Sequence, residues 1–459
     1  MSVHGPLRAE AYSGVVRLPA SDVPERVVSS SRRGLLGLTG VLVCGSLLSV
    51  AAAHTRSLLP ETIRFVPPSL AGAFGATGLN LHVGGAIAAL SLMFVSYAVV
   101  VAASTQLSTR AVLIAVVALH AVVLLGPPLV STDVFSYQAY ARLGSVYSFN
   151  PYLNGPHANP FDHVFQYIGS KWAYIPSVYG PVFTAFSYLL ASLSIATSVF
   201  AYKSIAAVAS LALVAVVWRC ARLRGINPVR AAALVGLNPL LVLYGVGGGH
   251  NDLLMLLAVA GSIWAMLASR ERTGGGLMMV AIGVKLTAGL LLPFVFAAGG
   301  PGRGRSRRDL LLGAGVGFAV IAALSFAVFG SGAFHLLATV RQSQSEGDWK
   351  SIPGAISTRL GMPTVGHITQ YVLAAAFVII CAWLVWRVWQ GATDWIDGAG
   401  WAMLALLIAS SSLLPWYVAW MLPLAALGHD RRLWRMAIVM TGIVQAIQLL
   451  GYIPHTALL

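Results

Sequence analysis

An acidic residue beside an apolar run is the first feature of the sequence that could do chemistry. Asp133 follows the break Gly126-Pro127-Pro128 and lies in the polar stretch 131–143. A carboxylate within one turn of an apolar span is partly desolvated, which raises its pKa unless a cation or hydrogen bonds compensate. Such a group can accept the proton of an alcohol. The alternative is a helix N-cap, in which the carboxylate only satisfies free backbone N–H groups.

Two other segments place charged groups in apolar surroundings. The glycines 247–249 precede His250, Asn251 and Asp252, and glycine lets the backbone approach a ligand closely. Lys285 is the only charged residue of the apolar segment 277–298, so its ammonium group needs an anionic partner such as phosphate. Ionisable residues within a membrane are candidates for function. A plain connecting turn, and snorkelling of Lys285 to lipid headgroups, are the alternatives.

Aromatic and amide side chains are frequent in the segment 131–177, which is long for a simple connection. These side chain types suit carbohydrate, which offers C–H faces for stacking and hydroxyl groups for hydrogen bonds. Interfacial anchoring in the membrane is the alternative for Trp and Tyr. The aromatic candidates for contact with a carbohydrate are Tyr152, Trp172, Tyr179, Trp349, Trp416 and Tyr417. Further candidates for binding a sugar or a phosphate, outside the two charged segments, are Tyr137, Arg142, Arg341 and Lys350.

The elements that must position these residues follow from composition. The 459-residue chain is 58% hydrophobic and 9% charged, with a mean hydropathy of +0.80, which excludes a soluble globule. Its net charge of +15 lies in short runs between apolar segments, so nucleic-acid binding is not expected. The three cysteines have no disulfide or zinc spacing. We predict an all-α polytopic membrane protein of roughly 12 to 13 transmembrane segments, with no metal or other cofactor.

Arginine-rich segments give the expected orientation. Positive charge collects on the cytoplasmic side, and the basic segments are 32–33, 219–230, 303–308 and 431–435. This arrangement puts 131–177, 247–252, 330–365 and 414–417 together on the outer side. It also requires that 178–197 lies along the membrane as a juxtamembrane helix, and that 277–298 enters and returns as a re-entrant hairpin with Lys285 at its tip.

At these residues the chain resembles the GT-C superfamily of membrane glycosyltransferases, and more narrowly its polyprenol-phosphate-mannose-dependent α-1,6-mannosyltransferases, which elongate lipomannan and related lipoglycans. The resemblance rests on 133–137, Asn150-Pro151-Tyr152, Tyr179-Gly180-Pro181, 249–252, Val284-Lys285 with Pro293, and Pro415-Trp416-Tyr417. It implies that Asp133 is the catalytic base, and that Lys285 and the turn 250–252 lie beside the donor phosphate. The catalytic loop here follows the third span, whereas many superfamily members have it after the first.

The resemblance implies a polyprenyl-phosphate-mannose donor and a lipid-linked glycan acceptor, with an active site on the extracytoplasmic face of the plasma membrane. A donor of another sugar, such as arabinofuranose, and a lipid or solute transporter are the alternatives. We expect a disordered cytoplasmic tail at 1–31 and two transmembrane helices in 32–110. A catalytic module would follow at 111–300, with its loop at 131–177, and a C-terminal transmembrane module at 301–459, with an outer loop at 330–365.

Overall fold

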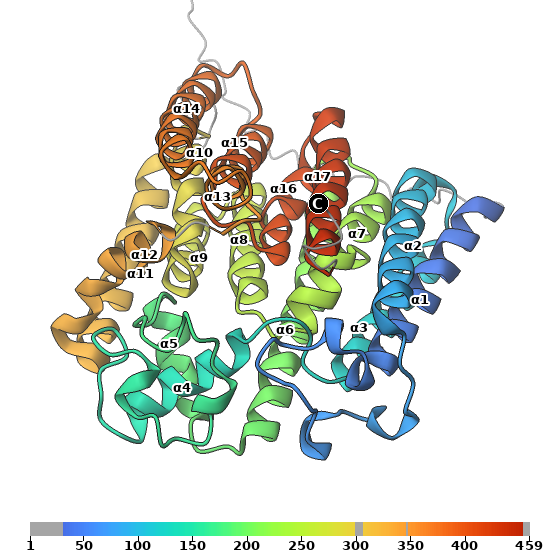
Figure 1. The fold of residues 1–459 in the computed structure, drawn as a ribbon. Helices are drawn as coiled ribbons and strands as arrows, with labels where there is room; N and C mark the ends of the chain where they lie inside the picture. The colour runs from blue at the N-terminus through green and yellow to red at the C-terminus, as the bar shows by residue number, and fades with distance from the viewer. Residues whose placement is uncertain (1–30, 299–305, 346–347, 453–459) are drawn as a thin grey trace, which may run out of the picture.

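The computed structural model describes residues 31–298, 306–345 and 348–452 as a bundle of helices (Figure 1). Within these residues there is no β-strand, as the all-α prediction requires. The predicted tail 1–31 lies outside the described residues except for Ser31.

The segment 32–284 forms the N-terminal helices and most of the elements that carry the polar candidate residues. Its α-helices are α1 (Arg32–Ala51), α2 (His82–Ala103), α3 (Thr109–Leu125), α4 (Asp133–Ser145), α5 (Pro181–Ser187), α6 (Ile195–Leu223), α7 (Pro228–Gly236), α8 (Asp252–Leu267) and α9 (Glu271–Val284). A π-helical turn, η9 (Leu240–Val246), continues α7 after a bend of 48°.

The segment 286–450 completes the bundle. Its α-helices are α10 (Leu292–Ala297), α11 (Arg307–Phe329), α12 (Leu336–Ser345), α13 (Ile352–Thr358), α14 (Pro363–Gln390), α15 (Trp395–Ala409), α16 (Leu422–Leu427) and α17 (Arg431–Leu450). Two 3₁₀ segments matter for the site, η10 (Leu286–Leu291) and η12 (Pro415–Trp420).

Local sequence explains where several of these helices begin. Ser108, Ser194 and Asn227 accept hydrogen bonds from backbone N–H groups in the first turns of α3, α6 and α7. Asp394 and Asp430 cap α15 and α17 in the same way. A short polar side chain before an apolar run therefore sets the helix start, because it satisfies N–H groups that have no partner within the helix.

Six helices among the described residues are long and apolar enough to cross a membrane, or seven if the bent pair α7 and η9 forms one span. Six further apolar helices of 10–17 residues bring the apolar segments close to the number predicted from sequence. Some of these cannot cross alone. The segment Pro181–Leu190 would be about 15 Å long, half of a bilayer core of about 30 Å. This length agrees with a helix at 178–197 that does not span.

The segment around Lys285 turns back as predicted. Helices α9 and α11 run in the same direction, because Gly275 packs against the backbone of Leu310 while Gly283 packs against Ile321. The chain between them must therefore return to the end at which α9 began. The reversal occurs at Lys285, whose extended backbone (φ −153°, ψ 125°) separates α9 from η10.

Helix α6 connects the two ends of the bundle. Near its start, Tyr202 and Lys203 pack beside Gly249. Beyond its last turn, Arg224 donates to the carbonyl of Leu427 at 2.7 Å and to Asp394 at 2.9 Å. These positions are about 33 Å apart along the helix, close to the thickness of a bilayer core. In Figure 1 the loop that carries α4 and α5 lies beside the lower part of α6.

Candidate active site

The candidate residues lie at breaks between helices. Asp133 is the first residue of α4, and Lys285 separates α9 from η10. The turn 247–251 joins η9 to α8, and Gly249 adopts a positive φ of 66°, which glycine accommodates without strain. Pro415 begins η12. A continuous helix pairs its backbone N–H and C=O groups internally, whereas a break leaves some of these groups free to bind a ligand.

Backbone hydrogen bonds hold these breaks together. The N–H of Leu129, just before α4, donates to the carbonyl of Gly247 at 3.0 Å. The N–H of Gly180 donates to the carbonyl of Val284 at 3.0 Å, and a Cβ on Gly180 would lie 2.2 Å from the carbonyl oxygen of Gly283. The loop, the glycine turn and the tip of the hairpin are therefore fixed relative to one another by the main chain.

Asp133 faces the imidazole of His250. Oδ2 of Asp133 lies 3.3 Å from Nδ1 of His250, and the Asp133 side chain is 15% exposed while that of His250 is fully buried. Burial acts to raise the pKa of Asp133, but His250 and the positive charge of Lys285 outweigh it, so that the pKa lies below its ordinary value of 3.8. A cation and hydrogen bonds therefore compensate for the desolvation of this carboxylate, which is one of the two outcomes that the sequence allowed. The carboxylate is ionised at neutral pH and reaches solvent.

Asp252 also lies near Nδ1 of His250, and it binds Lys285. Its Oδ1 accepts from Nζ of Lys285 at 2.7 Å and from the indole N–H of Trp420 at 2.6 Å. Oδ2 of Asp252 lies 3.9 Å from Nδ1 of His250. The anionic partner that Lys285 requires is thus supplied by the protein itself. Because Asp252 is occupied by these donors, Asp133 is the more accessible carboxylate of the two.

Aromatic rings enclose this cluster. Trp416 stacks on His250 with ring centroids 3.8 Å apart, and Tyr417 stacks on Trp420 at 4.0 Å. The ammonium group of Lys285 lies 5.2 Å from the ring centroids of both Tyr417 and Trp420. A cation over aromatic faces is stabilised by the ring quadrupole, so η12 and Asp252 together fix the lysine head group.

Several buried polar atoms of the cluster have no aligned hydrogen-bond partner among the described residues. They are Nδ1 and Nε2 of His250, Nδ2 of Asn251, Oδ2 of Asp252 and Nε1 of Trp416. Buried polar atoms in folded proteins are nearly always paired, and a group of exceptions in one place points to a polar ligand or ordered water. Tyr137 holds this turn in place. Its hydroxyl donates to Oδ1 of Asn251 at 3.3 Å and accepts from the backbone N–H of Asn251 at 3.2 Å.

Two family models match the chain. The model described as "Alpha-(1->6)-mannopyranosyltransferase, N-terminal domain" matches residues 32–299, and that described as "MptB C-terminal domain" matches 351–451. The first match alone covers more than half of the sequence. The chain belongs to the alpha-(1->6)-mannopyranosyltransferase family. The resemblance seen in the sequence is confirmed, and the chain is a membrane glycosyltransferase.

Curated relatives carry the same family name. Alpha-(1->6)-mannopyranosyltransferase A of Mycobacterium tuberculosis is 27% identical over 421 residues, which cover 86% of this chain and 80% of the relative. A probable alpha-(1->6)-mannopyranosyltransferase of Mycolicibacterium smegmatis is 29% identical over 66% of the chain, and alpha-(1->6)-mannopyranosyltransferase B of Corynebacterium glutamicum is 28% identical over the same share. The chain spans 62% and 56% of the length of these last two. No solved structure matches the chain.

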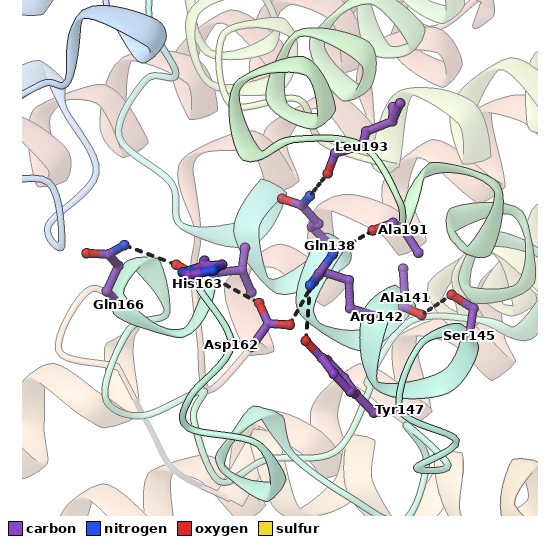
Figure 2. A network of polar contacts seen from close by, with 11 residues as sticks. Gln138, Ala141, Arg142, Ser145, Tyr147, Asp162, His163, Gln166, Ala191 and Leu193 are labelled. Carbon is purple, nitrogen blue, oxygen red and sulfur yellow. Dashed lines mark hydrogen bonds and ion pairs between the residues drawn. The ribbon is translucent and has the colours of Figure 1, made fainter.

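Arg142, a predicted donor-binding residue of this mannopyranosyltransferase, is used within the loop instead. Its Nε donates to Asp162 at 2.7 Å, and its terminal nitrogens donate to the carbonyl of Ala191 at 3.0 Å and to the hydroxyl of Tyr147 at 3.1 Å (Figure 2). Gln138, one turn earlier, donates to the carbonyl of Leu193. These contacts fasten α4 to the segment before α6, so Arg142 holds the loop in place and is not brought to the Asp133 cluster.

Among the described residues, neither Tyr152 nor Arg341 makes a hydrogen bond or ion pair with the Asp133 cluster. Tyr152 is 1% exposed and packs with Phe329 and Leu336, and its hydroxyl donates to the carbonyl of Tyr179 at 2.8 Å. It therefore stabilises the loop instead of presenting a surface to an acceptor. Arg341 lies on the exposed face of α12. Sequence alone shows the residue type and the loop, but not whether the side chain is buried or already paired.

Tyr179, just before α5, packs beside the cluster. Its ring packs edge-on against Tyr137 at 4.7 Å. Burial and the negative charge of Asp133 raise the pKa of the Tyr179 hydroxyl well above its ordinary value, so it stays protonated.

Trp172, Trp349 and Lys350 lie in the loops around the cluster and are partly buried. A Cβ on Gly169 would contact the Trp172 ring and the hydroxyl of Thr132, so Trp172 is near the start of α4. The segment of Trp349 and Lys350 is tied toward η12, because the N–H of Asp348 donates to the carbonyl of Ser411 at 3.0 Å. Burial lowers the pKa of Lys350, although the charge of Asp348 opposes this effect.

Two residues that organise the site were not predicted. Trp420 follows Trp416 at helical spacing, a pattern that could have indicated a shared face, but it lies in an apolar run that resembles a span. Lys203 is 1% exposed in α6, and its Nζ donates to the carbonyls of Gly126 and Pro127, the latter at 2.9 Å. It thereby holds the break before Asp133. Within the described residues, no group of three His, Cys, Asp or Glu side chains is arranged to hold a metal ion.

Proposed function

We propose that the chain transfers mannose from a polyprenyl-phosphate carrier to a hydroxyl group of a lipid-linked glycan, and that the product linkage is α-1,6. The family match and the names of its relatives support the sugar and the linkage. The observation that carries the proposal is the cluster of unpaired buried polar atoms between the Asp133 carboxylate and the Lys285 ammonium. It offers a proton acceptor on one side and a cation on the other.

Asp133 acts as the general base in this proposal. Its carboxylate takes the proton of the acceptor hydroxyl as that oxygen forms a bond to the anomeric carbon. The bond from the anomeric carbon to the phosphate oxygen breaks on the opposite face, and its electron pair leaves with polyprenyl phosphate. Attack and departure on opposite faces invert the configuration, so a β-linked mannosyl phosphate gives an α-linkage. A base with a low pKa suffices because the acceptor hydroxyl becomes strongly acidic as its new bond forms.

Lys285 stabilises the departing phosphate. Its Nζ is bound by Asp252 at 2.7 Å and its side chain is 14% exposed, so the ammonium is positioned before the donor arrives. Fixed charges directed at the place where negative charge develops lower the barrier without reorganisation. Nδ2 of Asn251 and Nε1 of Trp416, which have no aligned partner among the described residues, supply further donors in the same place.

An apolar groove beside Lys285 suits the polyprenyl tail. It has a volume of about 470 Å³ and lies between α5, α8 and α9. Its lining includes Leu254, two residues after Asp252, and Val284, directly before Lys285. A hydrocarbon tail in this groove would end with its phosphate at the lysine, which is the arrangement that the reaction requires.

The site faces the extracytoplasmic side in this proposal. The charged cluster lies at the Gly249 end of α6, whereas Arg224 and the basic loop 219–230 lie at the other end. Positively charged loops stay on the cytoplasmic side of a plasma membrane, so the cluster opens outward. Acceptor glycans would then reach it past the aromatic residues Trp172, Trp349 and Trp416.

Purified protein supplied with defined polyprenyl-phosphate sugars and a mannoside acceptor tests the proposal. We expect mannose transfer, an α-1,6 product by NMR, and a loss of about 10²–10⁴ in kcat for Asp133→Asn. Asp309→Asn is the matched control, because Asp309 pairs with the exposed Arg272 in a bridge at the surface. Transfer of arabinofuranose instead of mannose would contradict the sugar assignment. Full activity of Asp133→Asn would contradict the assignment of the base.

A further inference from the structure

The segment between α1 and α2 brings a further carboxylate, that of Glu61, to the loop that carries α4. The N–H of Val130 donates to the carbonyl of Leu58 at 3.0 Å. The hydroxyl of Thr62 donates to the carbonyl of Tyr167, also at 3.0 Å. In Figure 1 this segment and the loop that carries α4 lie at the same, lower end of the bundle. Glu61 stands between these two contacts in the chain, so they hold it close to the start of α4.

The side chains of Glu61, Thr132 and Trp172 meet around one point. A Cβ on Gly169 would lie 2.9 Å from Oε1 of Glu61. The same Cβ would lie 3.5 Å from Oγ1 of Thr132 and 3.5 Å from Cδ1 of Trp172. A glycine at position 169 therefore leaves room for the three side chains. Because Thr132 directly precedes Asp133, this point lies beside the proposed base.

The polar groups at this point are not used by the fold. Among the described residues, neither the carboxylate of Glu61 nor the hydroxyl of Thr132 makes a hydrogen bond or ion pair with another side chain or with the backbone. The side chain of Glu61 is exposed, and that of Trp172 is half-buried. A carboxylate can accept hydrogen bonds from two neighbouring hydroxyl groups, and an indole face packs against C–H groups. These are the contacts that a sugar ring offers.

The charges around this point favour a neutral ligand. Burial lowers the pKa of Lys350, and the negative charges of Asp348 and Glu61 oppose this effect, so the three groups are within electrostatic range of one another. Equal numbers of anionic and cationic side chains surround the point, which therefore has no net positive charge to attract a phosphate. Sugar hydroxyl groups both donate and accept, so they can use groups of either sign. The anionic side chains are Glu61, Asp133 and Asp348, and the cationic ones are Arg56, Lys171 and Lys350.

We propose that Glu61, Thr132 and Trp172 bind a neutral sugar ring of the acceptor glycan. The carboxylate of Glu61 accepts hydrogen bonds from two neighbouring hydroxyl groups of this ring, and the indole of Trp172 packs against its C–H face. A ring held there presents a hydroxyl group to Asp133. This inference rests on the proposed function, because it takes the acceptor to be a glycan. It adds Glu61 as a residue that binds the acceptor and has no part in binding the donor phosphate.

Kinetics of the full-length protein with a synthetic α-1,6-linked mannobioside as acceptor test this subsite. We expect Glu61→Ala to raise the KM for the mannobioside about tenfold or more, because hydrogen bonds to a charged group are lost, and to leave the KM for the donor unchanged. Asp309→Asn is the matched control, because it removes a carboxylate charge from a surface pair with Arg272. An unchanged mannobioside KM in Glu61→Ala would overturn the subsite. Equal increases in the KM for donor and acceptor would also overturn it.

A steric variant tests the same subsite without removing a polar group. The methyl group of Gly169→Ala would lie 2.9 Å from Oε1 of Glu61 and should displace this carboxylate, which is the end of a flexible side chain. We expect several-fold weaker binding of the mannobioside in calorimetric titration without donor. Gly84→Ala in α2 is the matched control, because a Cβ there meets no atom within 4 Å. Equal binding by the two variants would place the acceptor elsewhere.

The calorimetric titration also separates this inference from the proposed function. If the unchanged protein binds the mannobioside more tightly than Glu61→Ala but transfers no mannose to it, the subsite stands and the proposed reaction fails. If mannose is transferred and neither Glu61→Ala nor Gly169→Ala weakens mannobioside binding, the subsite fails and the reaction stands. A lower Tm of Glu61→Ala with unchanged mannobioside binding would show that Glu61 stabilises the fold alone, and would overturn the inference.

Discussion

The buried pair of Asp252 and Lys285 allows structure and catalysis to be separated by mutation. The side chains are 2% and 14% exposed and lie 2.7 Å apart. Removing one partner of a buried ion pair leaves an uncompensated charge and costs about 3–5 kcal/mol, whereas replacing both is often nearly neutral. Since Lys285 retains some contact with solvent, we expect Asp252→Asn to lower the free energy of unfolding by about 3 kcal/mol. Lys285→Met should have a similar effect.

The double variant Asp252→Asn/Lys285→Met should recover most of this stability, because no unpaired charge remains. Its expected loss is about 1 kcal/mol, which gives a coupling energy of several kcal/mol between the two sites. Mannose transfer should not recover. If the ammonium stabilises the departing phosphate as proposed, its loss should reduce kcat by about 10²–10³, as removal of one oxyanion donor does in other enzymes.

Stability is measured by denaturant titration in mixed micelles with tryptophan fluorescence, and transfer by incorporation of radiolabelled mannose at saturating donor. The matched control is Arg272→Gln/Asp309→Asn, which removes a bridge whose side chains are 71% and 35% exposed and which should contribute less than about 1 kcal/mol. A stable double variant that transfers mannose at the full rate would show that Lys285 stabilises the fold and has no role in catalysis. If the double variant lost as much free energy of unfolding as the two single variants together, the pair would not be coupled.

Three further predictions follow from the same contacts. The lowered pKa of Asp133 means that its contribution to stability is present above pH 3.8 and is lost as the pH falls through its lower folded-state pKa. The Tm difference between the unchanged protein and Asp133→Asn should therefore stay constant from about pH 7 to pH 5, and an earlier decline would contradict the lowered pKa. Ala258→Trp should obstruct the groove beside Lys285 and raise KM about tenfold for a long-chain donor but not for a short-chain one. Equal changes in KM for the two donors would argue against a tail in this groove. Arg224→Gln should lower the free energy of unfolding by about 2 kcal/mol without changing kcat, because the bond from Arg224 to Asp394 lies far from the reaction. A large loss of kcat in a folded variant would contradict this distance between Arg224 and the active site.

Much of the arrangement around the site could be predicted because polar residues are costly in a membrane. Lys285 was assigned to the tip of a hairpin because arginines flank the segment 277–298 on both sides, and the parallel course of α9 and α11 agrees. The short helix at Pro181–Leu190 agrees with a segment that does not span. Asp133 and His250 were found because they stand at breaks between apolar runs, where few other residues are polar.

Other features could not be read from the sequence, because they depend on pairing across the fold. Arg142 and Asp252 are both charged residues near a break between helices. Arg142 forms an ion pair with Asp162 within the loop, whereas Asp252 forms one with Lys285 within the cluster. Tyr152 has the same residue type as Tyr417, yet only Tyr417 stacks beside the lysine. Residue type and spacing identify candidates for a site, while long-range contacts decide which of them share it.

The position of the site follows from how helices satisfy their backbone. A continuous helix in a bilayer pairs its N–H and C=O groups internally and offers only side chains, whereas a broken helix can be tolerated where it is packed in protein or lines a cavity. The breaks at Gly249, Lys285 and Pro415 are all packed against one another and against α4. Hydrogen bonds tie two of these breaks to neighbouring segments, from the N–H of Leu129 to the carbonyl of Gly247 and from the N–H of Gly180 to the carbonyl of Val284, and Lys285 binds Asp252 beside the first. A substitution that straightened one of them, such as a change of Gly249 to a β-branched residue at its positive φ, should therefore disturb the whole cluster and not only its own turn.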